Sequence, residues 1–247
     1  MSLNPVIGEH FYVDKPLTWT SFDAVKRIRG VLIRRTGIKK LKVGHAGTLD
    51  PLATGVLIVC TGKATKQIDQ LQAGVKEYIA TIGLGATTPS YDLETEVDAT
   101  YPWEHITREM IDTALTNFIG SISQVPPSYS ACKVDGKRAY KMARKGKTVE
   151  LKAKELIIDE IEVLDFAPQS LTIRVVCSKG TYIRALARDI AQALGSGGHL
   201  TALRRTRVGD VREEDCVAVE QLIKYLEECE ITIPNESVNK NTSDIKQ

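Results

Sequence analysis

The chain has 247 residues, of which 43% are hydrophobic and 26% charged, and its formal net charge is +2. This length is enough for one large domain, or two small ones, with a sizeable core. No run of about 18 apolar residues occurs, and residues 1–10 lack the basic and apolar segments of a secretory signal, so we expect neither a membrane-spanning helix nor export.

The first predicted helix begins near Thr20 or Ser21 and ends at Gly37. A hydroxyl side chain can cap the start of a helix, and glycine readily takes the left-handed conformation that ends one. Between these residues the apolar positions recur with helical spacing. The predicted buried face consists of Phe22, Val25, Ile28, Leu32 and Ile33.

Further helices and strands follow without a regular pattern. In chain order we predict a helix over 20–37, a strand buried on both faces over 55–60, an alternating strand over 77–85, a helix over 107–120, a strand over 171–177, a helix over 181–195 and a helix-like piece over 219–228. Because strands and helices do not alternate regularly, the sequence favours an α+β fold over a doubly wound sheet.

Residues 124–150 interrupt the periodicity. This stretch, QVPPSYSACKVDGKRAYKMARKGKTVE, is basic, contains two prolines and is too long for an ordinary connection, so we interpret it as a functional, partly mobile arm. Residues 235–247 are polar, and we expect a disordered tail there. The remaining residues, 1–234, are predicted to form a single domain.

Charge is segregated along the chain despite the small net value. Residues 14–42 and 132–154 each hold nine Lys or Arg against two acids, and residues 174–212 hold eight against two. Acids gather instead in 92–112 and 213–230. If the fold brings the three basic segments together, they form the positive surface that a polyanion such as nucleic acid needs.

Neither a metal nor a nucleotide-phosphate motif is evident. The five cysteines and four histidines are dispersed and include no C-x-x-C pair, so we expect reduced cysteines, no metal and no cofactor in a cytosolic protein. The stretch TGKATK at 61–66 fails the phosphate-loop pattern, because Leu57 stands where its first glycine belongs and Ala64 follows the lysine.

Asp50 lies in VGHAGTLDPLATGVLIVC, residues 43–60, among glycines and just before an apolar run. An aspartate before proline is often a turn residue. Alternatively, the glycines let backbone or substrate approach closely, and a desolvated aspartate can be a nucleophile if a cation keeps it ionised. The polar residues His45 and Thr48 lie nearby, but no second carboxylate does, which argues against a glycosidase-like pair of acids.

The stretch GHAGTLDPLATGVL, unbroken from Gly44 to Leu57, resembles the signature motif of the TruB family of tRNA pseudouridine synthases. Other blocks that resemble this family follow in order and span roughly residues 9–220. They are KPLTWTS, KEYIATIGLG with Tyr78, QVPPSYSACKVDGKRAYKMAR, CSKGTYIRALARDI with Arg184, and GGHLTALRRTRVG with Leu203.

The sequence departs from the family pattern in three places. Thr18 and Thr95 each stand where the family usually has glycine; after TPSYD we expect only a loop variation. Many members also continue into a small C-terminal RNA-binding domain of the PUA type, for which this chain is too short. The resemblance is thus to a bacterial type without a full PUA domain, in which the catalytic domain provides most of the RNA affinity.

The resemblance implies a pseudouridine synthase fold. This is an α+β domain over 1–234, with a central mixed, mainly antiparallel sheet flanked by helices and an inserted basic RNA-gripping arm at about 124–150. It also implies isomerisation of a uridine in the T-loop of tRNA, at conventional position 55, after the base has been flipped out. The implied partner is the tRNA T-arm, with no membrane; we expect a cytoplasmic monomer.

The resemblance also implies roles for individual residues. Asp50 acts on the nucleoside as a nucleophile, at the ribose or the base, or helps to deprotonate the sugar on a glycal route, and the sequence leaves these open. Arg184 pairs with Asp50 and keeps it anionic, while Tyr78 stacks on the extruded base. The residues expected to contact substrate or RNA are His45, Leu203, Lys15, Thr48, Lys133, Arg144 and Lys179.

Two other functions remain possible at this point. A non-catalytic tRNA-binding or tRNA-folding protein could use the same scaffold, although the presence of Asp50, Tyr78 and Arg184 argues against it. An unrelated hydrolase with an aspartate nucleophile would act on small molecules and would not need the basic arm. Incubation with unmodified tRNA separates the three.

Overall fold

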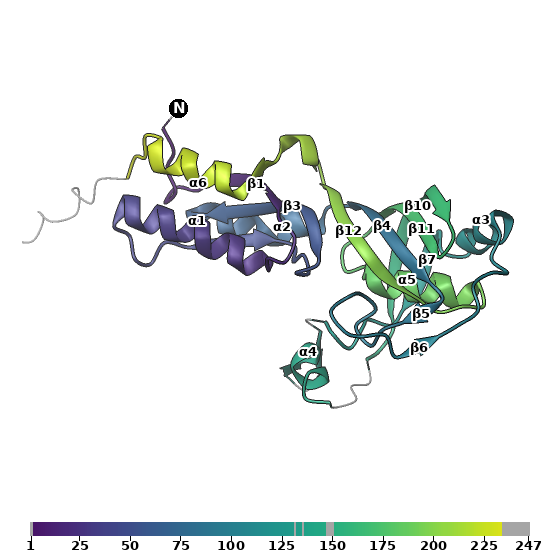
Figure 1. The fold of residues 1–247 in the computed structure, drawn as a ribbon. Coiled ribbons are helices and arrows are strands. Elements are labelled where there is room, and N and C mark those ends of the chain that lie inside the picture. Colours follow the sequence, from purple (N-terminus) through teal and green to yellow (C-terminus); the bar gives the residue numbers. More distant parts are fainter. Residues whose placement is uncertain (1, 131, 135, 147–150, 234–247) are drawn as a thin grey trace, which may run out of the picture.

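The computed structural model describes residues 2–233, except 131, 135 and 147–150. Its main feature is one large sheet of ten strands (Figure 1). These are β1 (His10–Lys15), β2 (Val43–Ala46), β3 (Ala53–Thr61), β4 (Lys76–Leu84), β7 (Gly120–Gln124), β10 (Lys154–Ala167), β11 (Ser170–Cys177), β12 (Gly198–Val208), β13 (Val211–Arg212) and β14 (Val217–Ala218).

The strand order is β14-β1-β3-β12-β4-β11-β10-β7, with β2 beside β3 and β13 beside β12. Among the described strands of this sheet, only β1–β14 and β3–β12 pair in parallel; the other pairs are antiparallel. The mixed, mainly antiparallel sheet that the resemblance implies is therefore confirmed, as is the α+β class.

Helices cover the sheet, and small hairpins extend from it. The helices are α1 (Ser21–Thr36), α2 (Ile68–Ala73), α3 (Arg108–Thr116), α4 (Ala139–Ala143), α5 (Ile183–Ala193) and α6 (Val219–Glu228), with 3-10 turns at Gly62–Gln67 and Glu213–Asp215. The hairpins pair β5 (Ala86–Thr87) with β6 (Ala99–Thr100), and β8 (Lys133–Val134) with β9 (Lys137–Arg138). No described helix has the length and apolar character needed to span a membrane.

The molecule has two halves joined by β12 (Figure 1). In one half, α1 and α6 pack on β1 and β3; in the other, α5 and α3 pack on β4, β11 and β10. A third cluster fills the opposite face of β3, so this strand is buried on both faces as predicted. Strand β12 pairs with β3 on one side and with β4 on the other, which places the join at the centre of the sheet.

Helix α1 forms where its end signals predict. The Thr20 side chain accepts a hydrogen bond from the backbone of Asp23, whose carboxylate accepts one from the backbone of Thr20, and Gly37 ends the helix at φ 72°. The predicted buried face is wrong at Phe22, which is 66% exposed, because Ser21 occupies the buried position of the first turn. The other buried positions include Val25, Ile28 and Leu32.

The remaining predicted elements are present with adjusted ends. Strand β4 alternates as expected, with Tyr78, Ala80, Ile82 and Leu84 buried. Helix α3 ends at Thr116 rather than near residue 120, because strand β7 already begins at Gly120. The arm leaves the sheet between β7 and β10 and includes β8, β9 and α4 (Figure 1). The predicted tail, 235–247, lies outside the described residues.

Candidate active site

Asp50 lies in the loop that joins β2 to β3, residues 47–52, here called the Asp50 loop. The loop is tied to the segment in front of α1. Ser21 Oγ accepts from the backbone N–H of Leu49 at 2.8 Å and donates to its carbonyl at 3.1 Å. The N–H of Thr18 donates to the carbonyl of Pro51 at 2.8 Å. Asp50 is therefore held between two well-anchored neighbours.

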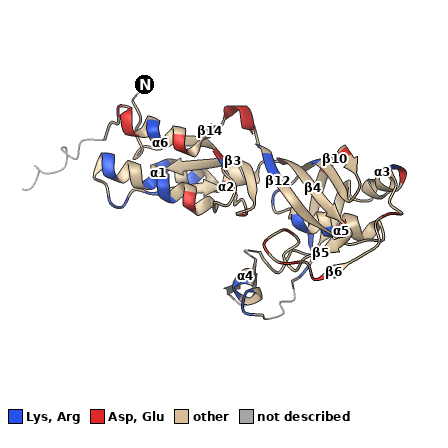
Figure 2. Ribbon diagram, in the orientation of Figure 1, with Lys and Arg blue, Asp and Glu red and all other residues tan. Residues whose placement is uncertain are grey.

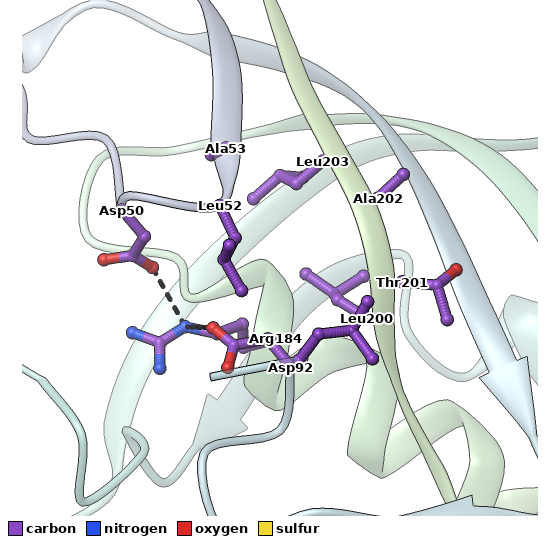
Figure 3. A pocket seen from close by; sticks show the side chains of 10 residues that line it. Asp50, Leu52, Ala53, Asp92, Arg184, Leu200, Thr201, Ala202 and Leu203 are labelled. Atoms are coloured by element: carbon purple, nitrogen blue, oxygen red, sulfur yellow. Dashed lines mark ion pairs between the residues drawn. The ribbon is translucent and has the colours of Figure 1, made fainter. Parts of the chain in front are cut away.

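Arg184, from the first turn of α5, points at Asp50. Its Nε lies 2.9 Å from Asp50 Oδ2 and 3.6 Å from Asp92 Oδ2, so two carboxylates face one guanidinium (Figure 3). Its Nη1 and Nη2 donate to the backbone carbonyls of Ser90 and Tyr129 at 3.0 and 2.9 Å. All three nitrogens are engaged, and this fixes the guanidinium plane against Asp50.

The electrostatics of Asp50 reflect two opposing effects. Burial raises the pKa of its carboxyl above the ordinary value of 3.8, and the negative charges of Asp92 and Glu94 raise it further. The charge of Arg184 and its hydrogen bond act in the opposite direction. The side chain keeps 39% of its surface exposed. Asp50 is therefore a partly desolvated acid with one cation beside it and one side open to a ligand.

A pocket of about 290 Å³, including its open mouth, adjoins this ion pair (Figure 3). Strand β12 provides much of the apolar wall, including the predicted substrate contact Leu203. The lining residues are Asp50, Leu52, Ala53, Asp92, Leu93, Arg184, Leu200, Thr201, Ala202 and Leu203. A mostly apolar pocket with one ion pair suits a flat group of moderate polarity.

Tyr78 belongs to the same core cluster as Leu49 and Ala53, and it is 9% exposed. Burial raises the pKa of its phenol; the nearby charge of Asp50 adds to this, whereas Arg205 opposes it. The hydroxyl is therefore protonated near neutral pH and can donate a hydrogen bond. Tyr78 is not among the residues that line the pocket in this structure.

His45 and Thr48 border the Asp50 loop. His45 is half-buried on β2, and its Nδ1 has no hydrogen-bond partner among the described residues. Burial, together with the charge of Arg205, lowers the pKa of its imidazole, so the ring is neutral at physiological pH. Thr48 is exposed. Both lie on the side of the loop that precedes Asp50 in the chain.

Lys15 does not fit the phosphate contact expected for it. Its side chain is completely buried at the end of β1. Its ammonium donates to the carbonyls of Trp19 at 2.6 Å, Pro16 at 2.8 Å and Pro51 at 3.5 Å, and burial lowers its pKa to about 8. Lys15 therefore holds the Asp50 loop from inside. Counting charges along the sequence could not separate it from its solvated neighbours.

Comparison with known proteins matches this chain to one family over nearly its whole length. A model described as TruB family pseudouridylate synthase (N terminal domain) matches residues 34–183. A second, described as tRNA pseudouridylate synthase B C-terminal domain, matches residues 184–236. The chain belongs to the TruB family.

Curated relatives and solved structures agree with this assignment. Proteins named tRNA pseudouridine synthase B from Phocaeicola vulgatus and Bacteroides thetaiotaomicron are 67% and 64% identical to this chain, and each match covers 91% of this chain and 95% of the relative. A solved Cbf5-Nop10-Gar1 complex contains a chain 30% identical, with a TM-score of 0.68, and the match covers 90% of this chain and 55% of that one. The pseudouridine synthase fold is therefore confirmed.

Several of the charged residues expected to contact RNA lie on or near the arm of this TruB family member. Arg144 follows α4 and pairs with Glu94, and its side chain is 59% exposed. Lys179 is exposed in the turn before α5. Lys133 belongs to β8, but its side chain lies outside the described residues. Lys and Arg gather on α4 and on α1, at a distance from each other (Figure 2).

Asp92 is a site residue to which the sequence analysis assigned no role. It lies in residues 88–95, here called the Asp92 loop, and its backbone carbonyl accepts hydrogen bonds from Thr88 Oγ1 at 2.7 Å and Ser90 Oγ at 3.2 Å. Thr95 Oγ1 accepts from the N–H of Ser90 at 3.1 Å, so the departure from the family's glycine closes the loop. The TPSYD block, residues 88–92, could have indicated this role, because its aspartate is Asp92. The sequence alone did not show that Asp92 lies beside Arg184.

Within the described part of the chain, no group of three or more His, Cys, Asp or Glu side chains is placed to hold a metal ion.

Proposed function

We propose that this protein converts a uridine in the T-loop of tRNA, at conventional position 55, into pseudouridine, with Asp50 as the reacting carboxylate. The observation that carries the proposal is the 2.9 Å contact between Asp50 and the buried Arg184 at the wall of an open, largely apolar pocket. The family assignment supports the reaction class, and relatives that match over most of their length are named tRNA pseudouridine synthase B.

The reaction is an isomerisation. The glycosidic N–C bond breaks, the base turns over, and a C–C bond forms to the same ribose. The base carbon that joins the ribose loses a proton and the freed ring nitrogen gains one, so no group is gained or lost overall. Asp50 attacks the ribose or the base as a nucleophile, or it removes a sugar proton on a glycal route. In each case Arg184 keeps the carboxylate charged and aimed, while the open side of Asp50 faces the nucleoside.

The pocket places the base between apolar walls. Leu203 and its neighbours on β12 exclude water from one side of the ring. Tyr78 stacks against the base after it enters, and its protonated hydroxyl provides a donor while the base is detached. Asp92 approaches the same Nε of Arg184 as Asp50 does and shares its charge.

The uridine must leave its folded loop before it can react. Unstacking costs a few kcal/mol, and phosphate contacts and stacking must offset it. His45 and Thr48, at the rim of the Asp50 loop, contact the space left by the flipped base. Lys179, Arg144 and Lys133 bind the T-arm backbone, which positions the RNA without reading its sequence.

We further propose that the chain acts as a cytoplasmic monomer with one catalytic domain, residues 1–234.

The test is to incubate the protein with unmodified tRNA and to map pseudouridine by position. Wild type should form it at one T-loop site, and Asp50→Asn should abolish it while tRNA affinity stays within a few-fold. Asp165→Asn, an exposed acid on β10, is the matched control and should react like wild type.

Other outcomes separate the alternative functions. Tight tRNA binding by wild type without any pseudouridine would favour the non-catalytic tRNA-binding protein. Normal turnover by Asp50→Asn would remove Asp50 from the chemistry.

A further inference from the structure

Arg205 is a buried cation for which the mechanism above has no use. It lies on β12 and is 1% exposed. Its neighbours on the same strand approach carboxylates: Arg204 Nη2 lies 2.9 Å from Asp14 Oδ2, and Arg207 Nη2 lies 3.9 Å from Glu77 Oε2. No ion pair involves Arg205 within the described residues. Arginine is rarely buried without a charged partner, because desolvating its charge is costly.

The partners of Arg205 are backbone carbonyls at the start of the Asp50 loop and in β3, just beyond the end of the loop. Its Nε donates to the carbonyl of Val56 at 2.8 Å, beyond the end of the loop. Its Nη2 donates to the carbonyl of Gly47 at 3.1 Å, and Nη1 reaches that of Thr48 at 3.5 Å, at the start of the loop. One rigid, planar guanidinium thus joins the start of the loop to β3, with Asp50 between them.

The glycines around Asp50 make room for this arginine. Gly55 has φ +102°, and a Cβ there would lie 2.1 Å from the backbone oxygen of Arg205. Gly47 has φ +90°, which favours glycine, and a Cβ there would lie at the ordinary contact distance of 3.4 Å from Arg205 Nη1. The sequence suggested that these glycines admit backbone or substrate; in the structure Gly55 admits the backbone of Arg205, and Gly47 lies against its guanidinium. Motif glycines and Arg205 therefore form one unit, although about 150 residues separate them.

Arg205 also lies beside other groups of the site. On β12 it is paired with Tyr78 of β4 on one side and with Gly55 of β3 on the other. Its charge acts on the titration of Tyr78, His45 and Lys15. It therefore lies at the centre of the site without lining the pocket, which is the place of a group that positions others.

We propose that Arg205 is a positioning residue for the reaction: its three hydrogen bonds hold the Asp50 loop at the height and angle that bring the carboxylate to Arg184 and the nucleoside. This inference rests on the proposed function for its kinetic consequence, but its structural consequence stands alone. A misplacement of about 1 Å at a reacting group can cost on the order of 10²-fold in rate. Loss of this clamp should act on the chemical step and leave RNA binding nearly unchanged.

The experiment compares wild type with Arg205→Met, which removes the charge and the hydrogen bonds, and Arg205→Lys, which keeps the charge but lacks the planar fork that spans from Val56 to Gly47. Leu222→Ala, in the α1–α6 core, controls for a general loss of stability. Three quantities are measured for each: the single-turnover rate of pseudouridine formation, the Kd for product tRNA that already carries pseudouridine at the target position, and hydrogen–deuterium exchange of the amides in residues 47–56. Thermal denaturation verifies folding.

We expect the single-turnover rate to fall about 10²-fold in Arg205→Met and less in Arg205→Lys, with Kd within about 3-fold of wild type. Exchange should rise in residues 47–56 of both variants and stay at the wild-type level there in Leu222→Ala. Wild-type rate and protection in Arg205→Met would overturn the proposal. The proposal would also be overturned if Leu222→Ala, at the same Tm as Arg205→Met, lost as much of the single-turnover rate.

The exchange measurement also keeps this inference separate from the proposed function. If wild type formed no pseudouridine, the proposed function would fail, while exchange would still show whether Arg205 holds the loop. If Arg205→Met does not fold, Arg205→Lys decides, since it retains the buried charge. A folded Arg205→Lys with wild-type exchange and rate would then overturn the positioning role.

Discussion

The Asp50 loop and the Asp92 loop face each other across Arg184 (Figure 3), and they are held by different kinds of bonds. The Asp50 loop receives charge-assisted hydrogen bonds from the buried cations Lys15 and Arg205, which come from β1 and β12. The Asp92 loop is closed mainly by its own hydroxyls, at Thr88, Ser90 and Thr95.

This difference separates two tasks. Hydrogen bonds to charged donors are roughly twice as strong as neutral ones, and those of the Asp50 loop come from the sheet. The loop that carries Asp50 is therefore anchored directly to the sheet. The Asp92 loop depends more on bonds within itself, although Arg184 Nη1 also donates to its Ser90 carbonyl. It touches the arm through the Glu94–Arg144 pair. Four variants test this comparison, from the largest expected effect to the smallest.

Arg184→Met removes the group that both loops face. Two carboxylates would then lie close together without their cation, so Asp50 would be protonated more easily and aimed less well. We expect the single-turnover rate to fall about 10³-fold, as for loss of one key electrostatic donor. Arg108→Met, an exposed arginine on α3, should leave the rate unchanged. A loss below 10-fold would show that the ion pair is structural only.

Asp92→Asn weakens the contact between Asp92 and Arg184 and leaves the contact between Asp50 and Arg184 intact. The negative charge of Asp92 raises the pKa of Asp50, and the rate requires the ionised acid. In wild type the rate should fall as the pH drops through a pKa above 3.8; in Asp92→Asn this fall should occur at a lower pH. At neutral pH we expect a loss of about 10-fold, from the weaker hold on Arg184.

The pH profile of single turnover measures the effect, with Asp69→Asn on α2 as the control. An acid limb at the same pH in Asp92→Asn and wild type would show that the two carboxylates do not interact.

A double change on the arm, Lys141→Gln with Lys145→Gln, tests whether RNA is gripped from the Asp92 side. Both lysines are exposed in or just after α4. Loss of two phosphate contacts should weaken tRNA affinity about 5- to 10-fold and reduce the slope of log affinity against log salt by about 1–2. Lys224→Gln, exposed on α6, should change neither. An unchanged slope in the double variant would mean that these lysines do not contact phosphate.

Thr18→Gly has the smallest expected effect and concerns the Asp50 side. Thr18 adopts φ 70°, and its N–H donates to the carbonyl of Pro51. This conformation costs a β-branched residue roughly 1–2 kcal/mol. Glycine avoids this cost but lowers the stability by about 0.4–1 kcal/mol, because it increases the conformational entropy of the unfolded chain. We expect the free energy of unfolding to rise by about 0.5 kcal/mol, measured by urea denaturation, with an unchanged rate. A clear fall in stability would show that the threonine side chain contributes more than its backbone costs.

The sequence was informative where local chemistry decides. The caps of α1, the alternation of β4 and the apolar run of β3 all follow from short-range patterns, and the family resemblance indicated the mixed sheet. It was less informative where a contact spans the chain. The 14 residues of β10 and the 11 of β12 were not predicted as strands, because charged residues interrupt their alternation.

The site shows the same limit. Motif residues such as Asp50 and Arg184 could be named, and the structure brings them together. The roles of Lys15 and Arg205 could not be inferred, since the sequence does not distinguish a buried lysine or arginine from a solvent-exposed one. Their partners are backbone carbonyls, which leave no trace in side-chain patterns. Only the three-dimensional arrangement shows that Gly47 and Gly55 are complementary to an arginine at the other end of the chain.

Strand β12 carries Leu203 at the pocket and Arg205 at the Asp50 loop, two residues apart on the same face, between bulges near Thr201 and Thr206. A slip of one residue in a strand turns every side chain to the opposite face. Deletion of a single codon between the bulges would therefore remove the pocket wall and the loop clamp in one event. This segment should accept changes of residue far more readily than changes of length.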